Sequence, residues 1–321
     1  MISRKEFIKK TLFAAAGSTL PSVWSDGENT SSDSPALTIL YTNDTHSRLE
    51  PFPENSRLYP GLGGAARRTS LVKKIRHESK NTLLLDAGDV FQGTAWFDLF
   101  GGELNFKIMS EMGYDAMVLG NHEFDLGLQG LADAAKHADF QMLAANYFTD
   151  ETVIDEIVKG YMVKQYRGMR VGIFGLGIRL DELVDPALFG KVRYRDPVII
   201  SRRIVQSLRR FHKCDYIICL SHLGYQYDQE DRMDDLKLAA SVPGIDLVIG
   251  GHTHSFLDEP VIINHPDEEP VWITQMGHGG VRLGRIDLKK MPDGSLEKES
   301  SYYIIGEEIK HISSVSGKNV T

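Results

Sequence analysis

Short apolar runs alternate with amphipathic stretches along most of this chain, beginning at residue 36. Residues 82–87 are mostly apolar, as in a strand that is buried on both faces of a sheet. Residues 64–77 instead carry Leu71, Val72 and Ile75 at the spacing of one helix face. By the same criteria we expect further strands at 37–42, 116–119, 140–145, 216–220 and 245–249, and further helices at 104–112, 128–137, 198–212 and 234–240. The alternation predicts an α/β fold.

The second half of the chain adds strands that follow one another without long helices. Residues 161–166 and 170–176 have the pattern of the two arms of a hairpin. Short strands are expected at 261–264, 271–275, 282–288 and 302–305. No repeat or low-complexity linker interrupts residues 36–308. We therefore expect one α/β domain with two sheets over residues 36–309, followed by a tail at 310–321.

The N-terminus has the pattern of an export signal. A basic segment at 3–10 precedes a short, weakly apolar stretch at 11–20, which is too short to span a bilayer. It resembles a twin-arginine (Tat) signal in which Lys5 replaces the second arginine, so we expect Tat export, with Sec as the alternative. Residues 1–24 are expected to be the signal peptide and 25–35 a polar linker, in a periplasmic protein. No cysteine directly follows the apolar stretch, so a stable membrane anchor is not expected.

The charge balance narrows the classes of ligand. The formal net charge is −8, from 36 Lys and Arg against 44 Asp and Glu, and the isoelectric point is near 5.8. A protein that binds nucleic acid without sequence preference needs a basic stripe, so we expect no nucleic-acid partner. A small anionic substrate is compatible with this charge, because bound cations can dominate the local field.

Five short segments carry Asp, His and Asn residues, and most of them directly follow an expected strand. Sites in open α/β sheets form outside the carboxyl ends of the strands, so these residues should meet there. Asp, His and Asn together suit Zn²⁺, Mn²⁺, Fe or Co²⁺ better than Ca²⁺. The segments are Asp44-Thr45-His46, Gly88-Asp89, Gly120-Asn121-His122-Glu123-Phe124-Asp125, Ser221-His222 and Gly250-Gly251-His252-Thr253-His254.

The spacing inside these segments favours two metal ions. Asp44 and His46 are two residues apart after a strand, and His252 and His254 repeat that spacing. At a strand end this spacing points both side chains the same way. Asp89 has two carboxylate oxygens, which could bridge two cations. Two cations about 3.5–4 Å apart clamp a phosphoryl group and lower the pKa of water, so the pattern predicts phosphoryl chemistry.

In these segments the chain resembles the catalytic domain of the secreted bacterial 5′-nucleotidase family, within the calcineurin-like metallophosphoesterases. The resemblance covers residues 37–305 and is most specific at 40–46, 63–67, 88–94, 113–125 and 244–254. It implies a four-layer α-β-β-α sandwich and a metal-dependent phosphoric ester hydrolase. It also implies that metal one is held by Asp44, His46, Asp89 and His254, and metal two by Asp89, Asn121, His222 and His252.

The resemblance further implies a catalytic group beside the metals. His122 matches a histidine that is not a ligand and that supports the phosphoryl transition state together with Asn121. Asp125 matches the partner that orients this histidine, since a carboxylate fixes the tautomer of an imidazole and favours its cation. His278, in the glycine-rich stretch 277–280, could also touch the substrate, and an ordinary loop position is an equal alternative.

The leading interpretation is a hydrolase of phosphate monoesters that uses two divalent ions (Zn, Mn, Fe or Co) and acts on nucleotides. A cyclic phosphodiesterase or a thiosulfohydrolase-type ester hydrolase is the second interpretation. The third is a non-catalytic subunit that binds a nucleotide or a partner, which the complete set of ligands and the His122–Asp125 pair disfavour. The family's C-terminal nucleotide-binding domain is expected to be absent here, so a separately encoded domain of that kind is a candidate partner.

Overall fold

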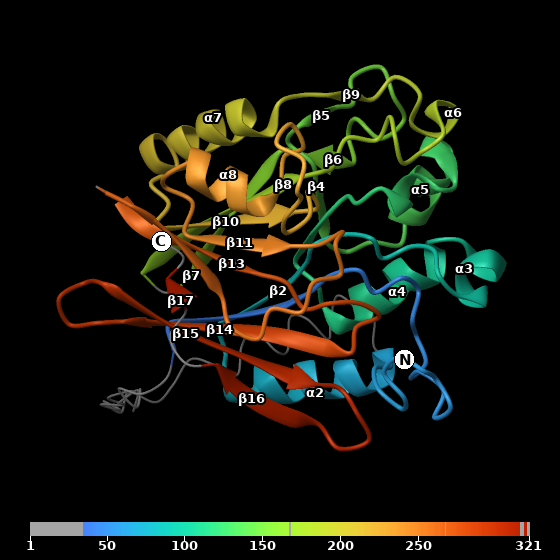
Figure 1. Cartoon of the computed structure of the whole chain (residues 1–321), viewed down its shortest axis with the longest axis horizontal. Helices are drawn as coiled ribbons and strands as arrows, with labels where there is room; N and C mark the ends of the chain where they lie inside the picture. The colour runs from blue at the N-terminus through green and yellow to red at the C-terminus, as the bar shows by residue number, and fades with distance from the viewer. Residues whose placement is uncertain (1–34, 167, 267, 315–317, 320–321) are drawn as a thin grey trace, which may run out of the picture. The chain divides into compact units, whose positions relative to one another are not determined.

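The computed structural model describes residues 35–166, 168–266, 268–314 and 318–319 (Figure 1). The expected signal peptide lies outside these residues, as does all of the expected linker except Pro35. Within the described residues two large sheets stack on each other, and helices cover the outer face of each (Figure 1).

The larger sheet combines a parallel half with an antiparallel half. Strands β1 to β4 and β6 pair in parallel, and β14, β15 and β16 continue the sheet in antiparallel fashion from β1. Its order in the described part of the chain is β16 (Lys310–Ser314), β15 (Leu296–Ile304), β14 (Arg282–Lys290), β1 (Leu37–Thr42), β2 (Thr82–Asp86), β3 (Ala116–Val118), β4 (Gln141–Leu143) and β6 (Val158–Lys159).

The smaller sheet has the same design, with a parallel centre formed by β8, β10, β11 and β13. Its order over the described residues is β17 (Lys318–Asn319), β12 (Val261–His265), β13 (Glu268–Thr274), β11 (Leu247–Gly250), β10 (Tyr216–Ser221), β8 (Met169–Leu176) and β7 (Tyr161–Tyr166). A separate two-stranded ribbon joins β5 (Tyr147–Phe148) to β9 (Arg193–Tyr194).

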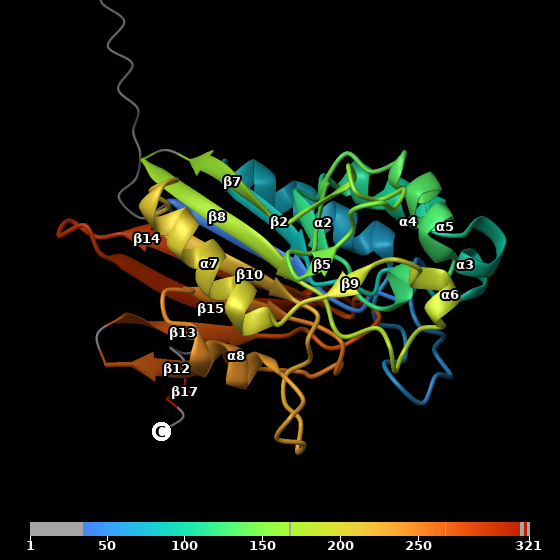
Figure 2. The ribbon, with the colours of Figure 1, turned by 90° about the horizontal axis from the view of Figure 1, so that it is seen from above.

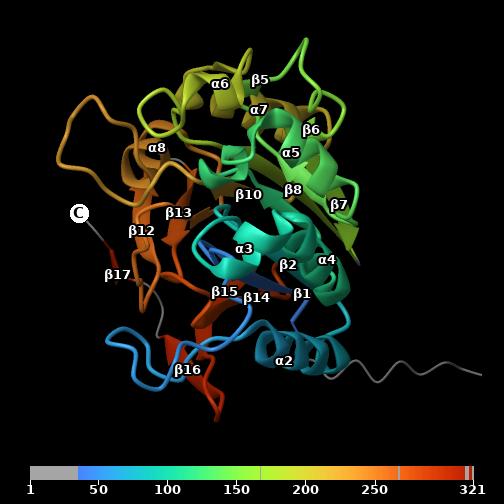
Figure 3. The ribbon, with the colours of Figure 1, turned by 90° about the vertical axis from the view of Figure 1, so that its right-hand side faces the viewer.

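Helices pack on the outer face of each sheet. Helices α2 (Ala65–Glu78), α4 (Glu103–Met112) and α5 (Gly127–Ala135) contribute to the apolar core outside the larger sheet. Helices α7 (Pro197–Arg210) and α8 (Asp235–Ser241) do the same for the smaller sheet, across which they lie in Figure 2. Figure 3 shows the two helical layers on opposite sides of the paired sheets. The short helices are α3 (Ala95–Phe100), η1 (His122–Phe124) and α6 (Pro186–Phe189).

The continuous apolar runs in the sequence follow from this layering. In β1, Ile39 and Tyr41 point into the core between the sheets, whereas Leu40 packs toward the helices. In β10, Ile218 points between the sheets and Cys219 points toward α7 and α8. Successive side chains of a strand point to opposite faces, so a strand covered on both faces is apolar at nearly every position. The expected four-layer α-β-β-α arrangement is confirmed.

Most expected elements are present, with ends shifted by a few residues. Helix α7 begins at Pro197, where the side chain of Asp196 accepts a hydrogen bond from the Ile199 N–H and caps the helix. The expected tail at 310–321 begins instead with β16, which pairs with β15 along Lys310–Ser314. The last expected strand is longer than 302–305, because β15 starts at Leu296.

The helices of the described residues have at most 14 residues. None of them combines the length and the apolar character that a crossing of a membrane would need.

Candidate metal centre

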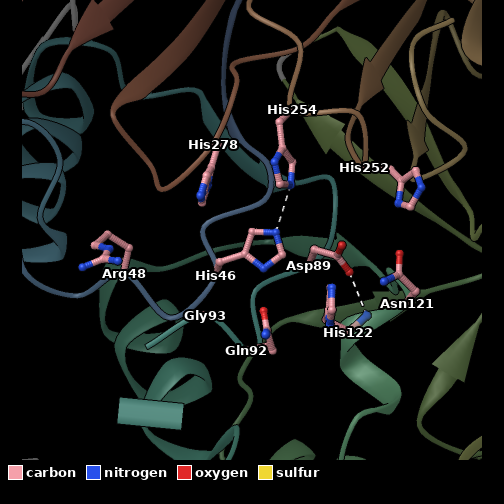
Figure 4. Close-up of a pocket in the computed structure, with 10 residues that line it drawn as sticks. All are labelled: His46, Arg48, Asp89, Gln92, Gly93, Asn121, His122, His252, His254 and His278. Atoms are coloured by element: carbon pink, nitrogen blue, oxygen red, sulfur yellow. Dashed lines mark hydrogen bonds between the residues drawn. The ribbon is translucent and has the colours of Figure 1, made fainter. Parts of the chain in front are cut away.

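The polar side chains singled out in the sequence lie in loops that follow the carboxyl ends of parallel strands. Both sheets supply such loops, and the loops face one cavity of about 330 Å³ (Figure 4). Asp44 and His46 follow β1, Asp89 follows β2, Asn121 and His122 follow β3, His222 follows β10, His252 and His254 follow β11, and His278 follows β13. This is the place where sites form in sheets of this kind.

The first group of donors consists of Asp44, His46 and His254. The Nε2 atoms of His46 and His254 face each other at 3.0 Å, and Asp44 Oδ1 lies 3.3 Å from His254 Nε2. His46 Nδ1 lies 3.2 Å from the carbonyl oxygen of Phe91 and donates to it, which leaves the Nε2 lone pair directed at the group. Two imidazole lone pairs and a carboxylate that converge in this way match the donor set of a divalent cation.

The second group consists of Asp89, His222 and His252. His222 is fully buried, and its Nδ1 donates to the Ala87 carbonyl oxygen at 2.6 Å. Its Nε2 lies 2.9 Å from Asp89 Oδ2 but has no hydrogen-bond partner of good geometry. A carbonyl that fixes the tautomer of a histidine in this way is typical of metal ligands.

Asn121 lines the same cavity from the loop after β3. Its Oδ1 is buried and has no hydrogen-bond partner among the described residues. The two donor groups are also joined directly, because the backbone N–H of His252 donates to the carboxylate of Asp44 at 3.0–3.1 Å. Unpartnered buried acceptors are costly unless something binds them, so Asn121 Oδ1 and His222 Nε2 support a metal at this position.

Several of these residues have an unusual backbone conformation. The φ angles of Asp44, His46, Asp89, His252 and His254 lie between 46° and 70°. This left-handed region is uncommon for residues other than glycine and is found most often at functional sites. Asp44 and His46 do belong to one group, as expected, but strand alternation is not the cause. Both residues lie beyond β1, and left-handed turns rather than a pleat bring their side chains together.

Glu123 holds two of the loops in position, a role that the sequence interpretation did not assign. Its carboxylate is fully buried and accepts hydrogen bonds from the backbone N–H groups of Gly120 at 2.7 Å, Val90 at 2.8 Å, Asp89 at 3.0 Å and Phe91 at 3.2 Å. Burial and the neighbouring Asp89 raise the pKa of Glu123 to about 7, and the hydrogen bonds from Gly120 and Val90 oppose this rise. The Asp89 loop is thereby fastened to the loop of Asn121.

Asn43 has the same role on the other side of the site. Its Nδ2 donates to Asp44 Oδ2 and to the Gly277 carbonyl, both at 2.7 Å, and its Oδ1 accepts from the Met276 N–H at 2.8 Å. The Asp44 loop is thus tied to the loop that carries His278. Asn43 directly precedes one candidate segment and Glu123 lies inside another, but only the fold identifies their hydrogen-bond partners.

Glycine is required where the Asp89 and Asn121 loops approach each other. A Cβ on Gly120 would lie 2.2 Å from Asp89 Oδ1. No real side chain tolerates that distance, so any larger residue would displace the carboxylate.

His122 and Asp125 form a pair beside the donor groups. His122 Nδ1 lies 2.8 Å from Asp125 Oδ2, and both side chains are about one third exposed. Burial lowers the pKa of His122, but the hydrogen bond to Asp125 and the charge of Asp89 raise it by more, so the pKa lies above its usual value. The backbone N–H of His122 also donates to Asp89 Oδ1 at 2.9 Å.

His278 lies at the opposite end of the cavity from His122 (Figure 4). Its ring stacks on that of His254 at 4.6 Å and meets the edge of His46 at 5.2 Å. Burial lowers the pKa of His278 to about 4, with a further decrease from the neighbouring His254 and His46. Arg48, Gln92 and Gly93 also line this cavity and had no expected role.

Comparisons with known proteins show the family to which the chain belongs. A family model described as calcineurin-like phosphoesterase matches residues 37–256. The chain is 34% identical over 290 residues to the snake venom 5′-nucleotidase of Gloydius brevicauda. This alignment covers 84% of this chain and 48% of that protein. It is 31% identical over 307 residues to the 5′-nucleotidase of Vibrio cholerae, with 88% of this chain and 53% of that protein covered.

A solved structure gives the same result. The crystal structure of a 5′-nucleotidase precursor from Thermus thermophilus superposes with a TM-score of 0.75 and 32% identity, over 84% of this chain and 55% of that chain. The chain spans about half the length of the curated relatives that it matches. It belongs to the calcineurin-like phosphoesterase family, whose members are metal-dependent hydrolases that use two divalent ions.

Proposed function

We propose that the chain hydrolyses phosphate monoesters with two divalent cations, and that nucleoside 5′-monophosphates are among its substrates. The observation that carries this proposal is the convergence of two donor groups and the His122–Asp125 pair on one cavity. The resemblance to 5′-nucleotidases of similar sequence supports the choice of substrate.

In this proposal each metal has its own donor group and the two share one carboxylate. Asp89 would be the shared ligand, because a carboxylate has two oxygens that could each hold a cation. Asp44, His46 and His254 complete the first site, and Asn121, His222 and His252 complete the second. When bound, the two cations polarise the phosphoryl oxygens and lower the pKa of water. The donor types suit Zn²⁺, Mn²⁺, Fe or Co²⁺.

The remaining polar groups would act on the phosphoryl group. Nδ1 of His122 is engaged by Asp125, so Nε2 is the atom that can donate a proton or a hydrogen bond to an oxygen of the substrate. Asn121 is its neighbour in the chain, and its side-chain amide could donate to the substrate while its buried, unpartnered Oδ1 would be free to hold a metal. Such preorganised donors stabilise the charge that develops in the transition state.

The test of this function is a substrate panel with the purified chain. After treatment with a chelator, the chain should be inactive on p-nitrophenyl phosphate, and Mn²⁺, Co²⁺ or Zn²⁺ should restore activity. Adenosine, guanosine, cytidine and uridine monophosphates should also be cleaved, and a cyclic nucleotide should be a poorer substrate. Equal activity with and without metal, or cleavage of the cyclic nucleotide alone, would overturn the proposal.

We also propose that the protein works in the periplasm after Tat export. The proposal is supported by the basic and weakly apolar segments at 3–20, which lie outside the described residues, and by a relative described as a precursor. Blocking the Tat translocase should trap the uncleaved protein in the cytoplasm. Normal export under that block would rule out the Tat route and leave Sec as the alternative.

A further inference from the structure

One positively charged side chain in the cavity, that of Arg48, has no role in the proposed reaction. Arg48 lines the cavity at the end marked by His278, away from Asn121 and His122 (Figure 4). Its guanidinium lies 4.4 Å over the ring of Phe52, and the Phe52 ring in turn lies 6.1 Å from that of His278. The charge is therefore held on an aromatic surface at the edge of the site.

Arg48 has a hydrogen-bond donor that the described part of the chain leaves unused. Its Nε is buried and has no hydrogen-bond partner among the described residues. The neighbouring His278 has a buried Nδ1 that is also without a partner. Two unpartnered polar groups side by side in a catalytic cavity are unusual, because a buried donor without an acceptor costs free energy.

The carboxylates of the site do not account for this charge. Asp44 and Asp89 belong to the two donor groups, where their oxygens face histidine nitrogens. Asp125 is engaged by His122 at the other end of the cavity. A guanidinium carries several N–H donors in a planar fork that matches the oxygens of a phosphoryl or carboxylate group. An oxyanion of a ligand is therefore the partner that the chemistry of Arg48 suits.

We propose that Arg48, with His278 beside it, forms a second anion subsite for the leaving group of the substrate. The inference rests on the proposed function, which places the reacting phosphoryl group between the donor groups and His122. The rest of the substrate then extends toward Arg48. The favoured substrates are phosphate esters whose leaving group carries its own oxyanion, either a phosphoryl group, as in a nucleoside diphosphate, or a carboxylate, as in a phosphorylated hydroxy acid.

The test compares two matched pairs of substrates in the Mn²⁺-reconstituted chain. Adenosine monophosphate and diphosphate differ by one phosphoryl group, and glycerol 3-phosphate and 3-phosphoglycerate differ by one carboxylate. Arg48→Met keeps an extended apolar stem against Phe52. In this variant, kcat/KM should fall about tenfold more for the substrate with the additional anionic group, adenosine diphosphate or 3-phosphoglycerate, than for its partner in the pair. The pair that responds identifies which oxyanion the subsite takes. Most of the change should be in KM, because binding of a remote group is lost.

Arg195→Met is the matched control, since Arg195 also lies over an aromatic ring, 4.9 Å from that of Phe148, but does not line the cavity. In this control, the ratio of kcat/KM between the two substrates of each pair should keep its wild-type value. Equal losses for both members of each pair in Arg48→Met, or no loss, would overturn the subsite while the phosphatase function stands.

A binding measurement separates failure of the subsite from failure of the function. Inorganic pyrophosphate should bind the reconstituted chain more tightly than orthophosphate in calorimetric titrations, and Arg48→Met should abolish that difference. If no ester is cleaved but this difference is found, the proposed reaction is wrong and the anion subsite remains. If Arg48→Met binds both anions as the wild type does, the subsite is refuted.

Discussion

At the scale of single residues, the partner of one ring nitrogen decides what each histidine can do. In His46 and His222, Nδ1 donates to a backbone carbonyl, so Nε2 presents a lone pair. In His122, Nδ1 is bound to the carboxylate of Asp125 instead, which favours a protonated ring that donates. In the proposed mechanism, histidines therefore serve as ligands in one part of the cavity and as an acid in another.

The acid role of His122 predicts that catalysis and metal binding can be separated. His122→Ala should keep the metal content of the wild type while kcat falls by about 10²–10⁴, the usual contribution of a positioned acid. Asp125→Asn should show a milder form of the same defect. The measurements are elemental analysis and steady-state kinetics, with His137→Ala, outside the cavity, as the control. Loss of a metal from His122→Ala would show that this histidine is a ligand.

The sequence singled out all six residues that form the two candidate donor groups, but only the family resemblance implied how the ligands divide between two metals. The structure brings together Asp44, His46 and His254, and likewise Asp89, His222 and His252. The tethers Asn43 and Glu123 were missed, because their hydrogen bonds join backbone groups of different loops. Arg48 was also missed, since an arginine two residues after a ligand gives no signal until the cavity is known.

At the scale of elements, the site depends on how loops are fastened to one another. The loops after β2 and β3 share the carboxylate of Glu123, and the loops after β1 and β13 share the amide of Asn43. Left-handed residues such as Asp89 and His252 need such support, because their conformation is unfavourable by about 1–3 kcal/mol each.

The Glu123 tether predicts a loss of both stability and metal affinity on substitution. Glu123→Gln removes the charge and turns an N–H₂ group toward backbone N–H donors. The free energy of unfolding should fall by about 2–4 kcal/mol, as for other buried hydrogen-bond networks. Thermal unfolding and metal titration measure the two effects. Glu103→Gln, on the exposed side of α4 beside Lys107, is the matched control and should melt near the wild-type temperature. A variant at Glu123 that melts like this control would contradict the tether.

Element prediction worked best where a continuous apolar run or a helical spacing was clear. The strands β1, β2 and β10 and the helix α7 appear within a few residues of their expected ranges. Helix α3 was missed because its six residues are nearly all apolar and too few to show a helical spacing, with Phe97 buried but Leu99 and Phe100 exposed. Strand β16 was missed because its sequence, Lys310–Ser314, has little apolar character and depends on pairing with β15.

At the scale of the whole molecule, the two sheets bring together residues that are far apart in the chain. Asp44 and His252 are separated by 208 positions, yet the N–H of His252 donates to the carboxylate of Asp44. Loops of the larger sheet carry Asp44, His46, Asp89 and Asn121, and loops of the smaller sheet carry the other proposed ligands, His222, His252 and His254. The four-layer arrangement could be inferred only through resemblance, because apolar runs alone do not show which strands share a sheet.

The central claim is that two cations share Asp89, and metal content tests it most directly. After reconstitution and removal of free metal, elemental analysis should find close to two divalent cations per wild-type chain. Asp89→Asn should lose both or nearly both, because it removes charge from the two sites at once, whereas Asp125→Asn should retain two. One cation or none in the wild type, or two in Asp89→Asn, would contradict the account.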